Sequence, residues 1–145
     1  MIRLENITPD NLEEVLALRV NDDQRRHVST VSDSLAQAYA YKGNAFPFVV
    51  YDDDKAVGFI MMGYYEAKQY YTLWKLLIDK DHQHKGYGRD ALKLGIDFLK
   101  KSFDVKEIYT GVTPGNSVAK HLYLSVGFKE TGLLENNMEE LRLEL

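Results

Sequence analysis

Two patterns of hydrophobic and polar positions alternate along the chain, and they predict strands and helices in a definite order. Apolar residues at alternate positions, or in short continuous runs, predict strands at residues 3–7, 46–51, 56–65, 70–79, 105–112, 128–132 and 138–145. Apolar residues that recur every three or four positions predict helices at residues 12–20, 32–41, 87–101 and 116–125. This order, with its seven strands and four helices, predicts an α+β fold.

Local signals set the ends of several of these elements. Pro9, in the sequence Thr-Pro-Asp-Asn, begins the first helix, and residues 32–34 (Ser-Asp-Ser) cap the second. The polar stretch at 21–27 between them is expected to be exposed. Residues 52–55 predict a hairpin turn, and Gly127 ends the last helix as a left-handed cap.

Length and composition suit a single domain over residues 1–145. No linker or repeat divides the chain, and no apolar run approaches the ~20 residues of a membrane-spanning helix. Residues 1–6 lack the apolar segment of a signal peptide. Cysteine is absent, which excludes disulfides, thiolate metal ligands and a cysteine nucleophile. These features favour a cytoplasmic protein that does not act at a membrane.

The formal net charge of −4 conceals an uneven distribution. Residues 1–54 carry about −5, whereas residues 79–106 carry about +2. An acidic region opposite a basic one suits a cationic substrate together with an anionic cofactor. For any one residue, a charge that merely solvates the surface is the alternative. A net acidic chain without a basic stripe argues against nucleic-acid binding.

A turn rich in glycine and basic residues, at 83–89 (Gln-His-Lys-Gly-Tyr-Gly-Arg), lies between an apolar run at 73–78 and a helical pattern at 91–99. The first turn of a helix has N–H groups without intrahelical partners and a partial positive charge. Glycine lets the backbone approach a ligand, and Lys85 and Arg89 add cationic side chains. These features favour a phosphate or pyrophosphate site, although the spacing alone suits an ordinary strand-to-helix turn equally well.

Two motifs, in this order, resemble those of the GNAT superfamily of N-acetyltransferases. The residues Gln83-x-x-Gly86-x-Gly88 resemble its acetyl-CoA signature, Gln/Arg-x-x-Gly-x-Gly/Ala. The second motif consists of an Asn, an Ala, a Leu-Tyr pair and a Gly-Phe pair, here Asn116, Ala119, Leu122-Tyr123 and Gly127-Phe128. The resemblance covers nearly the whole chain. Within the superfamily, the sequence is most similar to the bacterial spermine/spermidine acetyltransferases.

This resemblance implies a GNAT fold and an acetyl-CoA site. In that fold a mixed central sheet has two splayed strands, here those predicted at 70–79 and 105–112. The pantetheine arm would pair with the backbone of residues 76–78, and one of their N–H groups would face the thioester oxygen. The residues that the resemblance implies for cofactor binding are Leu76, Leu77, Ile78, Gln83, His84, Lys85, Gly86, Tyr87, Gly88, Arg89, Asn116, Ala119, Lys120 and Tyr123.

Three positions in this set have a specific steric or local interpretation. Gly86 and Gly88 are expected to be glycine because a Cβ at either would intrude on the phosphate oxygens. Asn116 serves equally well as a helix N-cap and as a ligand of the cofactor. His84 and Tyr87 occupy variable positions of the motif, and an exposed loop histidine is the expectation for His84.

The resemblance implies that Tyr123 is the general acid that protonates the departing CoA thiolate. A phenol, with an ordinary pKa of ~10, is protonated at neutral pH and suits this role. The incoming amine must lose a proton, and either Glu66 or a chain of water molecules could accept it. Neither a Ser-His-Asp arrangement nor a metal-ligand spacing stands out. We therefore expect direct attack in a ternary complex, without a metal or an acyl-enzyme.

The acceptor amine is expected to be small and polycationic, most simply a polyamine. Asp22, Asp23 and Glu66, with several tyrosines, could hold ammonium groups through ion pairs and cation–π contacts. An aminoglycoside, a peptide α-amine or a protein lysine would also suit an acidic site. A non-catalytic acyl-CoA sensor and a purely structural domain are the alternatives of another class. The C-terminal strands or an exposed sheet edge could form a homodimer, and the sequence leaves that open.

Overall fold

The computed structural model describes residues 1–25 and 29–145. Its strands are β1 (Ile2–Glu5), β2 (Ala45–Asp52), β3 (Lys55–Tyr65), β4 (Tyr70–Ile78), β5 (Glu107–Val112), β6 (Lys129–Glu135) and β7 (Met138–Glu144). They form one sheet in the order β1-β2-β3-β4-β5-β7-β6. Neighbouring strands are antiparallel except β4 and β5, which are parallel, so the sheet is mixed as predicted.

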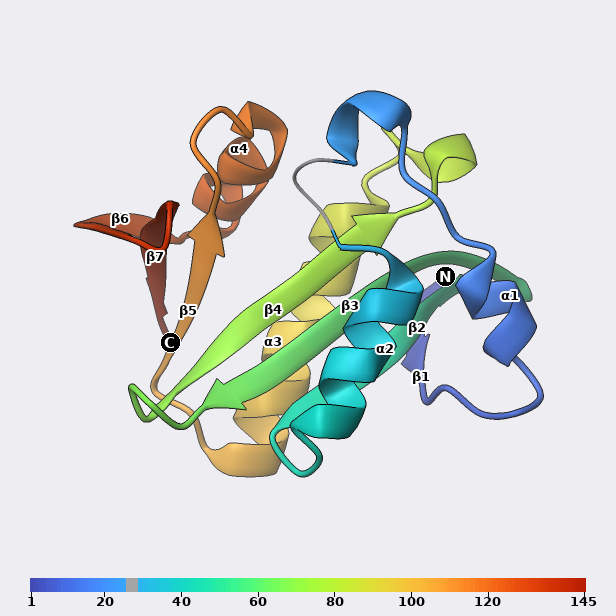
Figure 1. Cartoon of the computed structure of the whole chain (residues 1–145), viewed down its shortest axis with the longest axis horizontal. Helices are drawn as coiled ribbons and strands as arrows, with labels where there is room; N and C mark the ends of the chain where they lie inside the picture. The colour runs from blue at the N-terminus through green and yellow to red at the C-terminus, as the bar shows by residue number, and fades with distance from the viewer. Residues whose placement is uncertain (26–28) are drawn as a thin grey trace.

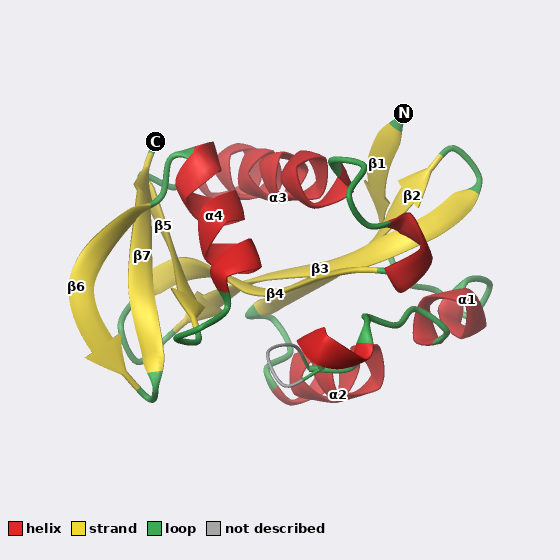
Figure 2. Cartoon of the chain, turned by 90° about the horizontal axis from the view of Figure 1, so that it is seen from above, coloured by secondary structure: helices red, strands yellow, loops and turns green. Residues whose placement is uncertain are grey.

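The helices cover both faces of this sheet. They are α1 (Leu12–Leu16), α2 (Val31–Ala40), α3 (Tyr87–Phe103) and α4 (Ser117–Val126), with two short 3-10 helices, η1 (Asp22–Gln24) and η2 (Lys80–His82). α1 and α2 lie on one face, and α3 and α4 lie on the other (Figure 2). The α+β fold predicted from the order of elements is therefore confirmed.

The central strand β3 explains why the core has two halves. Successive side chains of a strand point to opposite faces. Phe59 and Met61 accordingly pack in the apolar cluster under α1 and α2, whereas Ile60 and Met62 pack in the cluster under α3. Because helices cover both faces, β3 is one continuous apolar run rather than an alternating one.

β4 and β5 separate along their length (Figure 1). They pair only between residues 71–73 and residues 108–110. β4 then continues to Ile78, which remains paired with Gly58 of β3. Among the described residues, the β4 edge at 74–78 that faces β5 therefore has no partner strand. This confirms the predicted splay and leaves backbone groups of β4 available to a ligand.

The first helix is shorter than its apolar spacing predicts. The pattern extends to residue 20, but α1 ends at Leu16. The chain leaves the helix because the backbone of Arg19 bonds to the segment after β4. Its N–H donates to Oδ1 of Asp79 at 2.9 Å, and its carbonyl accepts from the N–H of Lys80 at 2.6 Å. A tertiary contact thus overrides the local helical preference.

The second helix begins earlier than predicted. Its N-cap is Thr30, whose hydroxyl accepts a hydrogen bond of 3.1 Å from the N–H of Asp33, and not the Ser-Asp-Ser sequence at 32–34. The cap of α4 is as predicted, with Asn116 before the helix and Gly127 after it at φ +119°. Of the polar stretch predicted at 21–27, residues 26 and 27 lie outside the described residues.

Strand boundaries differ from the predictions by one to three residues, as is usual for element ends. β1 ends at Glu5 rather than at residue 7, β5 begins at Glu107 rather than at residue 105, and β6 continues to Glu135 rather than to residue 132. The sequence did not predict η1 or η2. Both are single turns, too short to have a hydrophobic period of their own.

Candidate active site

A pocket of about 630 Å³ lies beside the open edge of β4. Its walls come from the end of β4, the loop that follows, the first turn of α3, helix α4 and η1. Of the residues predicted to bind the cofactor, those that line it are Leu76, Leu77, Ile78, Gln83, His84, Gly86, Tyr87, Gly88, Arg89, Asn116, Ala119 and Tyr123. Asp23, predicted to bind the amine, lines it too. The two motifs, about 30 residues apart in sequence, thus face one pocket.

The first turn of α3 directs backbone N–H groups to this pocket. Gly86 is the residue before the helix and adopts the left-handed conformation, with φ +83°. The first helical hydrogen bond runs from the N–H of Asp90 to the carbonyl of Gly86, at 3.1 Å. The N–H groups of residues 87–89 therefore have no partner within the helix. Together with the positive end of the helix dipole, they suit an anion.

Gly88 lines the pocket, and the packing of the protein around it does not require a glycine. A Cβ built on Gly88 would lie 3.5 Å from Cδ2 of Leu122 and 3.7 Å from Cγ1 of Ile78, which are ordinary contact distances. The fold would therefore accept alanine here. What alanine would change is the space above the free N–H groups of α3.

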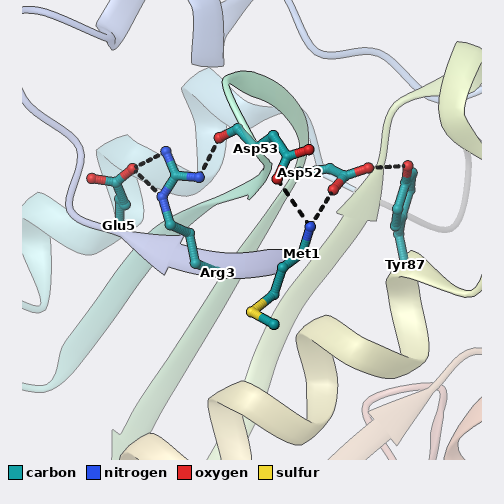
Figure 3. A network of polar contacts seen from close by, with 6 residues as sticks. All are labelled: Met1, Arg3, Glu5, Asp52, Asp53 and Tyr87. Carbon is teal, nitrogen blue, oxygen red and sulfur yellow. Dashed lines mark hydrogen bonds and ion pairs between the residues drawn. The ribbon is translucent and has the colours of Figure 1, made fainter.

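The side chain of Tyr87 fixes the start of α3 to the sheet (Figure 3). Its hydroxyl donates to Oδ2 of Asp52 at 2.6 Å, and the amino group of Met1 donates to Oδ1 of Asp52 at 3.0 Å. These two hydrogen bonds hold the pKa of Asp52 below its ordinary value, and the bond from Tyr87 has the larger effect. The same contact raises the pKa of Tyr87.

The side-chain amide of Gln83, the first residue of the glycine motif, makes three hydrogen bonds. Its Nε2 donates to the carbonyl of Ile78 at 3.0 Å and to Oε1 of Gln24 at 2.8 Å. Its Oε1 accepts from Nδ2 of Asn21 at 3.2 Å. Gln83 therefore joins the end of β4, the glycine turn and η1.

Tyr123 is buried within α4, with its ring 5.9 Å from that of Phe128. Burial raises the pKa of its phenol to about 12. The phenol is therefore protonated throughout the neutral range, and it lines the pocket. A buried, protonated hydroxyl at this place can donate a proton to a group that develops negative charge.

Two further residues of the pocket are already held by the protein. Oδ1 of Asn116 accepts from the N–H of Ala119 at 3.4 Å, so Asn116 serves as the N-cap of α4. Nη1 of Arg89 donates to the hydroxyl of Ser125 at 3.2 Å. This bond joins the first turn of α3 to α4 and fixes the guanidinium at the pocket.

Four predicted site residues lie elsewhere. Lys85 lines a smaller neighbouring pocket with Asp52. The ammonium of Lys120 pairs with Glu130 and Glu139 and does not line the main pocket. Asp22 and Glu66 are likewise absent from the pocket wall, although Asp22 is the immediate neighbour of Asp23 on η1.

Glu66 lies at the wrong end of β4 for the pocket. It follows Tyr65, which pairs with Tyr70 at the start of β4, whereas the pocket adjoins the end of that strand. Its Oε1 accepts a hydrogen bond of 2.9 Å from Nδ2 of Asn44. The structure therefore does not bring Glu66 together with Tyr123.

Sequence reasoning missed a β-bulge in β4. The register with β3 changes between the pairs Met61–Lys75 and Met62–Leu73, which leaves Trp74 as an extra residue. Trp74 and Lys75 consequently both face α2. The Trp74 ring lies 5.7 Å from that of Tyr41, and Nζ of Lys75 donates to the hydroxyl of Ser29 at 2.9 Å. Burial lowers the pKa of Lys75.

The pocket also has lining residues that the sequence did not single out. They are Val20, Gln24, His82, Gly115, Ser117, Val118, His121, Leu122 and Ser125. Leu122 stands inside the second motif and could have been included. Gln24 gave no signal, since its place at the pocket depends on its contact with Gln83 across the fold.

Two kinds of feature are absent from the described part of the chain. Residues 1–25 and 29–145 contain no group of three or more His, Cys, Asp or Glu side chains placed to hold a metal ion. No helix among them is long and apolar enough to cross a membrane.

Comparison with known proteins identifies the class to which this fold and pocket belong. The sequence model of the acetyltransferase (GNAT) family matches residues 12–128. A spermine/spermidine N(1)-acetyltransferase of Bacillus subtilis (strain 168) is 30% identical over 152 aligned positions, covering 99% of this chain and 97% of that protein. The chain therefore belongs to the GNAT family and is an acetyl-CoA-dependent N-acetyltransferase.

Solved structures agree on the fold. The crystal structure of spermidine N-acetyltransferase from Vibrio cholerae, in complex with CoA and spermine, matches with a TM-score of 0.75 and 20% identity, covering 97% of this chain and 92% of that one. The PaiA N-acetyltransferase from Thermoplasma acidophilum, in complex with coenzyme A, matches with a TM-score of 0.75 and 15% identity, covering 100% and 99%.

Proposed function

We propose that the pocket beside β4 binds acetyl-CoA and that the enzyme acetylates a primary amine of a polyamine such as spermidine or spermine. One observation carries the proposal: the pocket places a helix start suited to anions, a buried protonated tyrosine and the acidic turn η1 around one space. The similarity to a spermine/spermidine acetyltransferase along nearly the whole chain supports the polyamine.

The residues present fit acetyl-CoA. The free N–H groups of residues 87–89, with the Arg89 guanidinium, suit a pyrophosphate. The unpaired edge of β4 at 76–78 suits the amides of a pantetheine arm, by the same pairing that adds a strand to a sheet. Gly88 leaves the intervening space open. Acetyl-CoA supplies an activated acyl thioester at the end of that arm.

The chain contributes to the reaction in two ways. A backbone N–H within residues 76–78 stabilises the negative charge that develops on the thioester oxygen when the amine attacks. Tyr123 then donates its proton to the departing CoA thiolate, because its buried phenol is still protonated when the sulfur gains charge. The attacking nitrogen loses its second proton as the amide forms, and solvent returns a proton to the phenolate. Attack is direct, so the amine and acetyl-CoA occupy the site together.

The amine loses its proton to solvent. Glu66, the carboxylate considered for this step, lies at the far end of β4. A chain of water molecules from the pocket is the proton acceptor that we propose.

Asp23 at the pocket wall, with Asp22 beside it, attracts the second ammonium group of a polyamine. The lack of cysteine supports a cytoplasmic setting.

The test is an amine panel, with release of the CoA thiol as the measurement. Acetyl-CoA is offered with spermine, spermidine, putrescine, aminoglycosides and peptides with free α- or ε-amines. The proposal predicts turnover with the polyamines and an N-acetylated polyamine by mass spectrometry. Turnover confined to another amine would replace the polyamine, and CoA binding without turnover on any amine would favour an acyl-CoA sensor.

A further inference from the structure

The side chain of Gln83 joins the proposed cofactor site to the proposed amine site. Two of its hydrogen bonds reach the η1 segment: one is with Asn21, the residue before η1, and the other is with Gln24, the last residue of η1. The two acidic residues of the turn, Asp22 and Asp23, lie between these anchor points. The third bond of Gln83 reaches the carbonyl of Ile78, at the end of the splayed strand.

Within residues 1–25 and 29–145, few other contacts hold η1 in place. None of its three residues is buried, and the side chain of Asp22 is 93% exposed. Among the hydrogen bonds of the described residues, the backbone of Arg19, three residues before η1, also bonds to Asp79 and Lys80 in the loop after β4. A turn without a buried side chain gains little position from packing, so hydrogen bonds and the ion pair of Asp22 with Arg25 determine where its carboxylates lie.

We propose that Gln83, through Gln24 and Asn21, couples cofactor binding to amine binding. Gln83 is then a positioning residue. Acetyl-CoA that occupies the glycine turn fixes the backbone of Gln83, the side-chain amide holds η1, and the two carboxylates stay where the ammonium group of the substrate meets them. This inference rests on the proposed function, because it takes η1 as the amine site.

Coupling of this kind is reciprocal. If CoA strengthens the binding of a polyamine by some factor, the polyamine strengthens the binding of CoA by the same factor. The coupling can therefore be measured from the CoA side alone, without following turnover. The relevant quantity is the Kd of CoA without spermine divided by its Kd with spermine. A substitution that changes both Kd values by the same factor leaves this ratio unchanged.

The experiment is calorimetric titration of CoA into the protein with and without saturating spermine. In the wild type, spermine should lower the Kd of CoA by at least about fivefold, and in Gln24→Leu the ratio should fall below about twofold. Asn21→Ala should reduce it in part. Gln37→Leu is the matched control: it lies on α2, and its side chain makes no hydrogen bond within the described part of the chain. The control should retain the wild-type ratio.

A ratio in Gln24→Leu equal to that of the wild type would overturn the inference. Failure of the polyamine proposal has a different signature, namely that spermine does not bind to the wild type at all. For that case, hydrogen exchange of residues 20–25 is measured with and without CoA alone. Slower exchange with CoA in the wild type but not in Gln24→Leu supports the coupling, and unchanged exchange in the wild type overturns it.

Discussion

The hydroxyl of Tyr87 donates a hydrogen bond of 2.6 Å to Oδ2 of Asp52, and so joins the first residue of α3 to the last residue of β2. The N–H groups that suit a pyrophosphate lie in this first helical turn. Their direction depends on how the helix start is held against the sheet. Asp52 therefore contributes to the pocket from outside it.

Breaking this contact should weaken CoA binding. Tyr87→Phe and Asp52→Ala each remove the bond, and each should raise the Kd of CoA by a few-fold to about tenfold, measured by calorimetry. The double variant should be no worse than Asp52→Ala alone, because the bond that Tyr87→Phe removes is already lost when Asp52 is replaced. Additive losses would mean that the two side chains act independently.

Since the pKa of Asp52 is lowered, its hydrogen bond with Tyr87 should persist down to acid pH and be lost as the pH falls through that lowered value.

Gly88→Ala should separate folding from cofactor binding. Its Cβ meets only ordinary contacts, so thermal stability should be unchanged or slightly higher. CoA binding should weaken by about tenfold or more, because an extra carbon in a packed contact costs about 1–3 kcal/mol. Gly95→Ala in the same helix is the opposite case. Its Cβ would lie 2.8 Å from Sδ of Met62, so it should lower stability and leave the Kd of CoA unchanged.

Tyr123→Phe should lower kcat by about a hundredfold, the usual contribution of a general acid, and leave the Kd of CoA nearly unchanged. Tyr109→Phe, on β5, is the control, because the hydroxyl of Tyr109 bonds to Glu107 and Tyr109 does not line the pocket. Burial raises the pKa of Tyr123 to about 12, so its phenol stays protonated from neutral to alkaline pH. The ratio of wild-type to Tyr123→Phe kcat should therefore be constant from pH 7 to pH 10. A ratio that declines toward pH 10 would contradict this assignment.

The burial of Lys75 should make the free energy of unfolding depend on pH. Burial lowers its folded pKa below the ordinary value of 10.5, an effect larger than the opposing attraction of Asp33. Between the folded and unfolded pKa values the unfolded chain binds more protons, so the contribution of Lys75 to stability rises with pH there. The free energy of unfolding of Lys75→Met, minus that of the wild type, should decrease from pH 7 to pH 10. Urea denaturation measures it, and a constant or growing difference would show that Lys75 is not desolvated.

The sequence was sufficient for the features that depend on local pattern and motif. The order of strands and helices, the cap of α4 by Asn116 and Gly127, and the glycine turn before α3 all follow from short-range signals. The position of Glu66 could also have been inferred. It precedes β4 whereas the glycine turn follows it, so the two lie a strand's length apart.

Other features required three-dimensional contacts. The early end of α1 depends on Arg19 bonding to Asp79, 60 residues away. The hydrogen bond between Tyr87 and Asp52 depends on how α3 lies against β2, and the bulge at Trp74 depends on the register with β3. No periodicity in a single sequence encodes such relationships between distant segments.

The central claim is that acetyl passes directly from acetyl-CoA beside β4 to an amine in the same pocket. The most direct test is a matrix of initial rates in which acetyl-CoA and spermidine are both varied. The account predicts double-reciprocal lines that intersect, as for a ternary complex. Parallel lines, together with an acetylated protein isolated after incubation with acetyl-CoA alone, would contradict it.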